Sequence, residues 1–270
     1  MTATTTDKVF AGAIPKIYES HLVPMIFEPY ASDIAGRLAE RKVTRLLEIA
    51  AGTGVVTRAL AAALDAEIIA TDLNQAMLDE AAARGAGRAI QWRQADALAL
   101  PFGAAEFDAV VCQFGAMFFP DRAKAYSEVR RVLKPDGVFV FNVWDRIEDN
   151  EFADVITRSL EEMFPKDPPR FLARTPHGYC DPRAIERDLA AAGFASKPRI
   201  DTVTARSPAT SARMPAVAYC QGTPLRNEIE ARDATRLAEA TDIAAAALAK
   251  QFGTAAIDGK IQALVVTVQA

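Results

Sequence analysis

The feature that most constrains the fold is a repeated alternation of short apolar segments with amphipathic segments between residues 45 and 145. The apolar segments have the length of buried strands, and the segments between them place apolar residues at helical spacing. This alternation is typical of βαβ units, in which parallel strands form one sheet and helices cover its faces. The sequence therefore predicts an α/β fold built on a mostly parallel sheet.

Seven strands are expected in this fold. They are Arg45–Ile49, Glu67–Thr71, Ala89–Arg93, Phe107–Gln113, Val138–Val143, Lys197–Arg206 and Gln262–Gln269. A turn is expected at Lys134–Gly137, where proline and glycine would end the preceding helix. Asn74 is a predicted helix N-cap, and Asp181-Pro182 is a predicted helix start, with cap followed by a preset first turn.

Residues outside the alternating region are expected to add helices to the core. We predict an N-terminal helical cap over residues 1–43 and a core formed by residues 44–207 and 259–270. Residues 208–258 would form a helical lid insertion, with Met214, Val217, Tyr219 and Leu225 as an apolar wall. A chain of 270 residues is compatible with one large structural domain of this kind.

Charge and cysteine content exclude several classes of protein. The 31 basic and 35 acidic residues give a net charge of −4, which argues against a nucleic-acid-binding protein because such proteins carry a basic face. Cys112, Cys180 and Cys220 are far apart, as in a reducing compartment. The apolar runs are too short for a membrane span, and the N-terminus lacks the apolar stretch of a signal peptide. We expect a cytoplasmic monomer or homodimer without membrane or nucleic-acid partners.

Three segments at the predicted strand ends indicate a ligand site. The turn Ala50–Gly54 is made of small residues, which let a ligand approach the main chain at the start of a helix. Asp72 ends the second strand, at a position suited to hydrogen bonds with ribose hydroxyls. Asp96 follows the third strand and could accept a hydrogen bond from an exocyclic amine. Ligands of open parallel sheets bind at this edge, beyond the carboxyl ends of the strands.

The spacing of residues in the turn and the following helices distinguishes a nicotinamide-binding site from a site for S-adenosylmethionine. The dinucleotide fingerprint requires a third small residue in the turn, but Thr57 occupies that position. Tyr126 is followed four residues later by Arg130, where short-chain dehydrogenases carry lysine. S-Adenosylmethionine has no pyrophosphate and needs no phosphate cradle. Glu48 would then orient the glycine turn or lie near the cationic end of the cofactor.

The chain resembles the class I S-adenosylmethionine-dependent methyltransferases, within the small-molecule group often named type 11. The resemblance covers roughly residues 44–145, and its motifs occur in the family's order. They are Glu48–Gly54, Thr71-Asp72-Leu73-Asn74 with Met77-Leu78, Ala95-Asp96-Ala97 with Leu100-Pro101-Phe102, Phe107-Asp108, and Arg131–Gly137. It implies a Rossmann-like seven-stranded sheet, mostly parallel with an antiparallel last strand, helices on both faces and helical lid insertions.

The resemblance also implies which residues bind S-adenosylmethionine and its product S-adenosylhomocysteine. Ala50, Gly52 and Gly54, with Thr53 between the two glycines, would line the methionine moiety, although the family often has glycine in place of Ala50. Asp72 would hold the ribose. Asp96 and Ala97 would meet the adenine, and Leu73 and Met77 would stack around it. Gln113 and Phe114 would face cofactor and substrate.

Residues for proton transfer are few. The chain has two histidines, His21 and His177, and Tyr18 shares a predicted helix face with His21. These three are the candidate catalytic residues, although each histidine also fits a structural role. Methyl transfer is an in-line displacement, so positioning and desolvation supply most of the rate, and a base is needed only if the acceptor must lose a proton. No metal site is predicted.

The sequence thus predicts a methyltransferase that uses S-adenosylmethionine and acts on a small, partly hydrophobic metabolite. Two alternatives stay open at this stage. One is an NAD(P)-dependent oxidoreductase, and the other is a protein that binds S-adenosylmethionine without transferring its methyl group.

Overall fold

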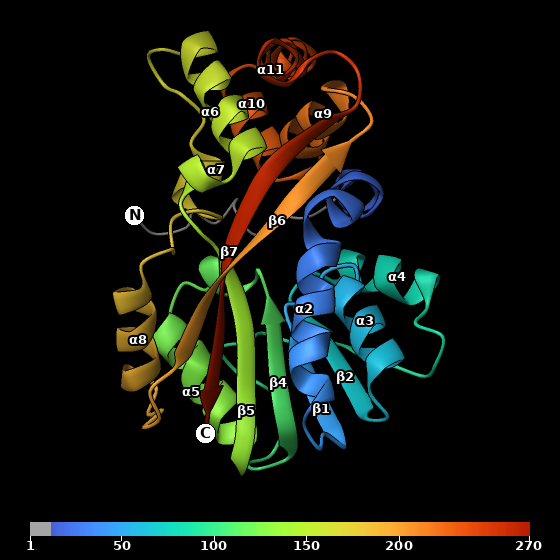
Figure 1. The fold of residues 1–270 in the computed structure, drawn as a ribbon, viewed down its shortest axis with the longest axis vertical. Coiled ribbons are helices and arrows are strands. Elements are labelled where there is room, and N and C mark those ends of the chain that lie inside the picture. Colours follow the sequence, from blue (N-terminus) through green and yellow to red (C-terminus); the bar gives the residue numbers. More distant parts are fainter. Residues whose placement is uncertain (1–11) are drawn as a thin grey trace. The chain divides into compact units, whose positions relative to one another are not determined.

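The computed structural model describes residues 12–270, which form two compact units (Figure 1). The first unit contains the residues up to Phe27 together with Trp144–Gly178 and Thr204–Gln262. The second unit contains Glu28–Val143, Tyr179–Val203 and Ala263–Ala270. Residues 208–258 lie entirely in the first unit, while the division into cap, core and lid stays a prediction.

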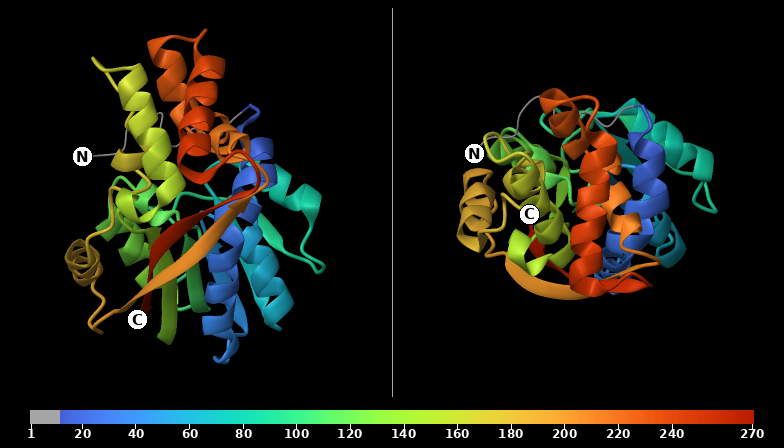
Figure 2. Two further views of the ribbon diagram at one scale, coloured as in Figure 1. Left: turned by 45° about the horizontal axis from the view of Figure 1, so that its top comes forward. Right: turned by 90° about the horizontal axis from the view of Figure 1, so that it is seen from above.

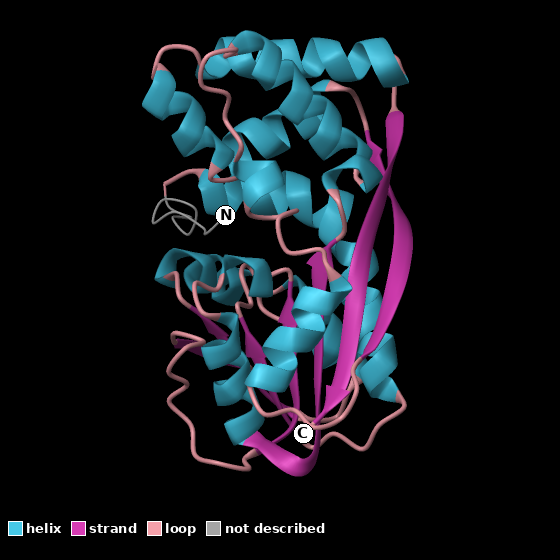
Figure 3. Ribbon diagram, turned by 90° about the vertical axis from the view of Figure 1, so that its left-hand side faces the viewer, coloured by secondary structure: helices cyan, strands magenta, loops and turns pink. Residues whose placement is uncertain are grey.

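A seven-stranded sheet has the order β3-β2-β1-β4-β5-β7-β6. Its strands are β1 (Arg45–Ile49), β2 (Glu67–Asp72), β3 (Gln91–Gln94), β4 (Phe107–Gln113), β5 (Leu133–Trp144), β6 (Arg199–Ala209) and β7 (Ile257–Gln269). The pairs among β1 to β5 are parallel, and β7 is antiparallel. The predicted Rossmann-like architecture is therefore confirmed. Figure 3 shows β6 and β7 as two long strands side by side.

Six helical segments of the second unit surround its strands. They are α2 (Glu28–Ala39), α3 (Val55–Ala63), α4 (Gln75–Arg84), η3 (Ala116–Phe118), α5 (Arg122–Val132) and α8 (Pro182–Ala191). The predicted start of α8 is confirmed, because the Asp181 side chain accepts a hydrogen bond from the Arg183 N–H at 2.9 Å. Asn74 does precede α4, but its side chain makes no capping hydrogen bond.

Alternation along β5 explains why helices cover both faces of the sheet. Val138 and Val140 belong to one buried cluster with residues of α2 and α3. The intervening Phe139 and Phe141 point the other way, where both rings contact Tyr126 of α5. A strand that is apolar on both faces is typical of the centre of a parallel sheet.

The first unit is mainly helical outside its parts of β6 and β7. Its helical segments are α1 (Ile14–Ile17), the π-helix η2 (Tyr18–Phe27), η4 (Ile147–Asp149), α6 (Glu151–Met163), α7 (Phe171–Arg174), α9 (Arg213–Gly222), α10 (Leu225–Arg232) and α11 (Leu237–Phe252). Helix α11 packs on α9 and α6, and α9 packs on η2 (Figure 2). Helices α9 to α11 lie within residues 208–258, and the role of this segment as a lid insertion stays a prediction. None of the helices described in residues 12–270 has the length and apolarity to cross a bilayer.

The main error of the sequence prediction concerns the segment Lys134–Gly137. We expected a turn, but these residues belong to β5, which begins at Leu133. Leu133 pairs with Phe107 and Val138 with Ala109, so the register shifts and the proline and glycine occupy a bulge. Proline lacks the N–H of a regular ladder and is tolerated at such bulges. The boundaries of the predicted third, sixth and seventh strands also differ by a few residues.

Candidate functional site

The turn between β1 and α3 has an unusual main chain. Ala50, Gly52 and Gly54 all adopt left-handed conformations, with φ of 54°, 56° and 82°. A Cβ atom at Gly54 would also lie 2.7 Å from the Trp92 ring, so both space and conformation require glycine there. Ala50 adopts a conformation that costs an L-residue about 1–2 kcal/mol. The small residues of this turn therefore serve a tightly bent main chain.

This strained alanine gives a testable prediction. Ala50→Gly should raise the free energy of unfolding by about 0.5–1 kcal/mol, because relief of the left-handed strain exceeds the added entropy of the unfolded chain. Chemical denaturation of the two proteins measures the difference. Ala51→Gly is the matched control, since Ala51 is buried and lies outside the left-handed region. It should lower stability, and a loss of stability in Ala50→Gly as well would contradict the strain argument.

Glu48, near the end of β1, is a buried carboxyl group. It is 1% exposed, and the Thr57 hydroxyl donates a hydrogen bond to its Oε2 at 2.6 Å. Burial raises the pKa of Glu48 to about 8, although the Thr57 hydrogen bond and the charge of Arg58 act in the opposite direction. Glu48 thus joins β1 to α3 on either side of the glycine turn.

Asp72, at the end of β2, connects two loops at the carboxyl edge of the sheet. Its Oδ2 accepts from the Gly52 N–H and its Oδ1 from the Asn74 N–H, each at 2.8 Å. Burial raises the pKa of Asp72, while the hydrogen bonds from Asn74 and Gly52 oppose that rise. The adjacent Leu73 is 45% exposed and is the single large exposed hydrophobic side chain in the described part of the chain. Its neighbour in the predicted adenine site, Met77, is buried.

The loop after β3 lies beside Asp72. The Ala95 N–H donates to the Asp72 carbonyl at 3.0 Å, which brings the predicted adenine-binding residues to the same edge. Asp96 is exposed and its Oδ1 accepts from the Leu98 N–H at 2.9 Å, so this side chain also caps a turn. Ala97 is half-buried next to it.

The end of β4 completes the site. Gln113 is buried, and Phe114 has a left-handed main chain with φ of 51°. The Phe114 N–H donates to the side-chain oxygen of Asn142 at 2.9 Å, and its ring meets Tyr30 edge-on at 5.2 Å. Asn142 and Tyr30 were not among the predicted site residues. The signal for Asn142 was present, because it is the one polar residue within the predicted strand Val138–Val143.

All twelve predicted cofactor-binding residues lie in the second unit, in or next to the segments just described. Parallel strands β1, β2, β3 and β4 bring their carboxyl ends to one edge, which is where open α/β sheets bind ligands. The geometry therefore joins a bent glycine turn, a buried carboxylate and an exposed apolar side chain at a single edge.

Residues 47–141 match a family model described as a methyltransferase domain. A demethylmenaquinone methyltransferase of Thermus thermophilus is 32% identical over 167 residues, which cover 57% of this chain and 76% of that protein. The chain belongs to the class I S-adenosylmethionine-dependent methyltransferases. This assignment sets aside the nicotinamide alternative.

Two further proteins are similar to this chain. An uncharacterized protein of Mycobacterium tuberculosis is 40% identical over 102 residues, and the alignment spans 37% of each chain. The structure of phosphoethanolamine N-methyltransferase 2 from Haemonchus contortus, in complex with phosphomonomethylethanolamine and S-adenosylhomocysteine, has a TM-score of 0.59. It is 18% identical and covers 94% of this chain and 56% of that one, which shows a shared fold.

S-Adenosylmethionine is the cofactor of this family, and the site at the carboxyl edge of the sheet fits it. The Thr53 hydroxyl is buried in the glycine turn and has no hydrogen-bond partner within the described residues. An unpartnered buried hydroxyl is costly unless a ligand or water completes it. The site therefore offers a ligand one polar group, the Thr53 hydroxyl, and one apolar group, the exposed side chain of Leu73 beside Asp72.

The candidate catalytic residues all lie in the first unit. Tyr18 and His21 belong to the π-helix η2, where Tyr18 stacks on Phe27 and His21 Nδ1 lies 2.7 Å from the Ser20 hydroxyl. His177 follows α7 and is buried, with its Nδ1 2.7 Å from the Asp145 carbonyl oxygen. Residues 12–270 contain no group of three or more His, Cys, Asp or Glu side chains that could hold a metal ion.

Burial of His177 predicts acid sensitivity. Burial lowers its pKa from 6.5 to about 4, so the unfolded chain binds a proton that the folded chain does not take up between these values. The stability from neutral His177 is complete above pH 6.5 and is lost as the pH falls toward 4, by about 2–3 kcal/mol. His177→Gln should reduce this slope in pH-dependent unfolding. His21→Gln, which retains His177, should keep the slope, and an unchanged slope in His177→Gln would refute the assignment.

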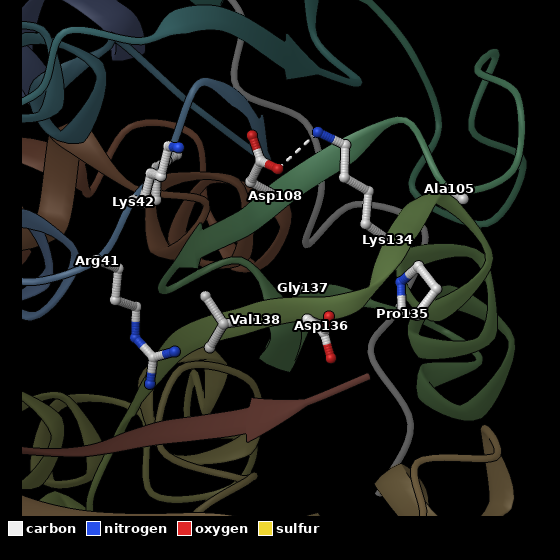
Figure 4. Close-up of a pocket in the computed structure, with 10 residues that line it drawn as sticks. Arg41, Lys42, Ala105, Asp108, Lys134, Pro135, Asp136, Gly137 and Val138 are labelled. Atoms are coloured by element: carbon white, nitrogen blue, oxygen red, sulfur yellow. Dashed lines mark hydrogen bonds and ion pairs between the residues drawn. The ribbon is translucent and has the colours of Figure 1, made fainter.

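A hollow of about 580 Å³ lies in the second unit at the amino ends of β1, β4 and β5, the edge opposite the carboxyl ends (Figure 4). Figure 4 shows the Lys134 ammonium directed at the Asp108 carboxylate, a 2.6 Å ion pair. Asp108 also accepts hydrogen bonds from the Thr44 N–H, the Thr44 hydroxyl and the Arg45 N–H. These partners hold the pKa of Asp108 well below its usual range. The Phe107-Asp108 motif therefore joins three strands and has a structural role.

Proposed function

We propose that this chain transfers the methyl group of S-adenosylmethionine to a small, partly hydrophobic acceptor. The observation that carries the proposal is the Asp72 carboxylate, which joins the Gly52 turn to the Asn74 turn beside the exposed Leu73. A carboxylate next to an apolar platform suits a nucleoside, whose ribose offers paired hydroxyls and whose base offers a flat apolar face. Family membership supplies the identity of that nucleoside.

Each part of the site has a proposed task. Asp72 accepts hydrogen bonds from the ribose hydroxyls, and Leu73 and Met77 contact the adenine beside Asp96 and Ala97. The turn from Ala50 to Gly54 admits the methionine end, with Glu48 beneath it. When bound, the cofactor supplies a methyl group on a positively charged sulfur. Gln113 and Phe114 face that end, so the chain contributes mainly positioning and exclusion of water.

Two observations support a partly hydrophobic acceptor. The Thermus thermophilus relative is named for demethylmenaquinone. In this chain, Met214 and Val217 on α9 are half-buried, while Tyr219 and Leu225 are buried. These four side chains would form an apolar wall for the acceptor, with residues 208–258 acting as a lid.

His177 is the strongest candidate for a base, should the acceptor need to lose a proton. The Asp145 carbonyl only accepts hydrogen bonds, so Nδ1 of His177 carries the proton and Nε2 carries the lone pair. The lowered pKa keeps the ring neutral at pH 7. The fixed tautomer leaves Nε2 as the atom that would accept a proton, but a pKa of about 4 makes this imidazole a weak base at pH 7. Tyr18 and His21 are the alternatives.

A binding and turnover experiment tests the proposal. Calorimetry should give micromolar binding of S-adenosylhomocysteine and no binding of NAD⁺. Formation of S-adenosylhomocysteine from S-adenosylmethionine is then measured with two acceptor panels, alkyl-substituted phenols and quinols against small polar amines. The first panel should react faster. Binding without turnover by any acceptor would favour a protein that binds the cofactor without transfer, and binding of NAD⁺ alone would overturn the proposal.

A further inference from the structure

The main chain at Phe114 adopts a conformation that its side chain disfavours. Its φ of 51° places a bulky aromatic residue in the left-handed region, which is normally occupied by glycine, asparagine or aspartate. Such a residue persists only where the surrounding structure holds it, and these positions concentrate at functional sites. The contacts that hold Phe114 are therefore informative.

Asn142 supplies two of those contacts. The Phe114 N–H donates to Asn142 Oδ1 at 2.9 Å and to the Asn142 main-chain oxygen at 3.2 Å. Asn142 is completely buried on β5, opposite Gln113 of β4. Since an N–H needs an acceptor, this bond fixes the orientation of the amide, with Oδ1 toward Phe114.

The NH₂ group of the same amide lowers the stability of the fold. Asn142 Nδ2 is buried and has no hydrogen-bond partner in the part of the chain that the structure describes. Burying an unpaired NH₂ group is unfavourable, and an apolar side chain of similar size would avoid it. The benefit of Asn142 therefore lies in the oxygen that it presents to Phe114.

The bend at Phe114 also reaches the glycine turn. At the next residue, Gly115, a Cβ atom would lie 2.4 Å from the Ala50 Cβ and 2.8 Å from the Cys112 sulfur. The Ala50 methyl group thus packs directly against the Gly115 main chain, and both Ala50 and Phe114 are left-handed. If Phe114 relaxed, Gly115 would move against or away from Ala50. Asn142 is in this way connected to the turn after β1.

We propose that Asn142 is a positioning residue, which holds Phe114 in its left-handed conformation and thereby keeps the turn Gln113–Gly115 and the Ala50 turn in register for cofactor binding. The proposal rests on the proposed function of these turns. Asn142 acts through Phe114 and Gly115 and need not contact the cofactor itself. Its essential group is the side-chain oxygen.

Three variants separate this role from general loss of packing. Asn142→Leu keeps the branch point at Cγ and removes the oxygen, whereas Asn142→Asp keeps an oxygen acceptor in either protonation state. Phe114→Gly adopts the left-handed conformation without help. Tyr126→Phe is the control, because it removes a buried hydroxyl from the same unit, one that meets Tyr179 at 3.5 Å on the α5 face.

Two measurements are made on the full chain, and the first needs no ligand. Hydrogen exchange at the Phe114 amide should be about a hundredfold faster in Asn142→Leu than in the parent and near the parent rate in Asn142→Asp. Affinity for S-adenosylhomocysteine should fall about tenfold in Asn142→Leu and less than about threefold in Asn142→Asp and Tyr126→Phe. In the Phe114→Gly background, the effect of Asn142→Leu should shrink to about threefold or less.

The outcomes distinguish the two proposals. If the parent does not bind S-adenosylhomocysteine, the proposed function fails, while hydrogen exchange still decides whether Asn142 holds Phe114. If the parent binds and Asn142→Leu has unchanged affinity, the positioning role is overturned. Equal losses in Asn142→Leu and Asn142→Asp, or an equal loss in Tyr126→Phe, would overturn it as well.

Discussion

Replacing Asp72 with alanine is expected to weaken binding of S-adenosylhomocysteine by about a hundredfold. Two hydrogen bonds from ribose hydroxyls to a carboxylate contribute about 1.5 kcal/mol each, which together correspond to that factor. The same carboxylate accepts the Gly52 and Asn74 N–H groups, so the variant also releases both loops. Calorimetric titration of the two proteins measures the change.

Two control variants separate ribose binding from damage to the fold. Asp72→Asn retains one acceptor oxygen and should lose affinity less than alanine does. Asp108→Asn removes a carboxylate that also accepts main-chain N–H groups, but at the opposite edge of the sheet. It should lower the unfolding temperature with little effect on affinity. Equal affinities of the parent and Asp72→Ala would remove Asp72 from the cofactor site.

The success of the sequence prediction depended on how local each signal was. The bounds of Arg45–Ile49 and Phe107–Gln113 agree with the structure because each contains a short apolar run, Leu46-Leu47 and Ala109–Cys112, and is followed closely by small residues that end the strand. Asp181-Pro182 specifies its helix start through its own side chain and a preset φ. The carboxyl-edge location of the predicted cofactor residues followed from the parallel order of the strands, which the βαβ alternation implies.

The errors and omissions have non-local causes. Lys134–Gly137 carries a turn signature, but pairing with β4 draws it into a bulged strand. The left-handed main chain of Phe114 arises from a hydrogen bond to Asn142, 28 residues away, and no local pattern marks a phenylalanine for that conformation. Glu48 is among the residues predicted from the sequence, but the rise of its pKa comes from burial in a core that the sequence alone does not describe.

The raised pKa of Glu48 leads to the second large expected effect, an unusual dependence of stability on pH. The Glu48 pKa is about 8 in the folded chain against an ordinary value of 4.5. Between these values the unfolded chain has lost a proton that the folded chain retains, so the contribution of Glu48 to stability falls as the pH rises. Glu48→Gln cannot ionise and keeps an oxygen for the Thr57 hydroxyl. Relative to the parent, it should gain roughly 4 kcal/mol of unfolding free energy from pH 4.5 to pH 8.

Denaturant unfolding of the parent and Glu48→Gln at pH 5, 6.5 and 8 measures this gain. Glu128→Gln is the control, because the pKa of Glu128 is lowered and not raised in the folded chain. Arg131 holds the pKa of Glu128 at about 2, so its stabilising contribution is present above pH 4.5 and is lost only as the pH falls toward 2. The difference between Glu128→Gln and the parent should therefore stay constant from pH 5 to pH 8. A constant difference for Glu48→Gln over the same range would mean that Glu48 is already ionised in the folded chain at pH 5. The surrounding groups would then stabilise the charge of Glu48, and the conclusion that this carboxyl group is neutral in the folded chain would be wrong.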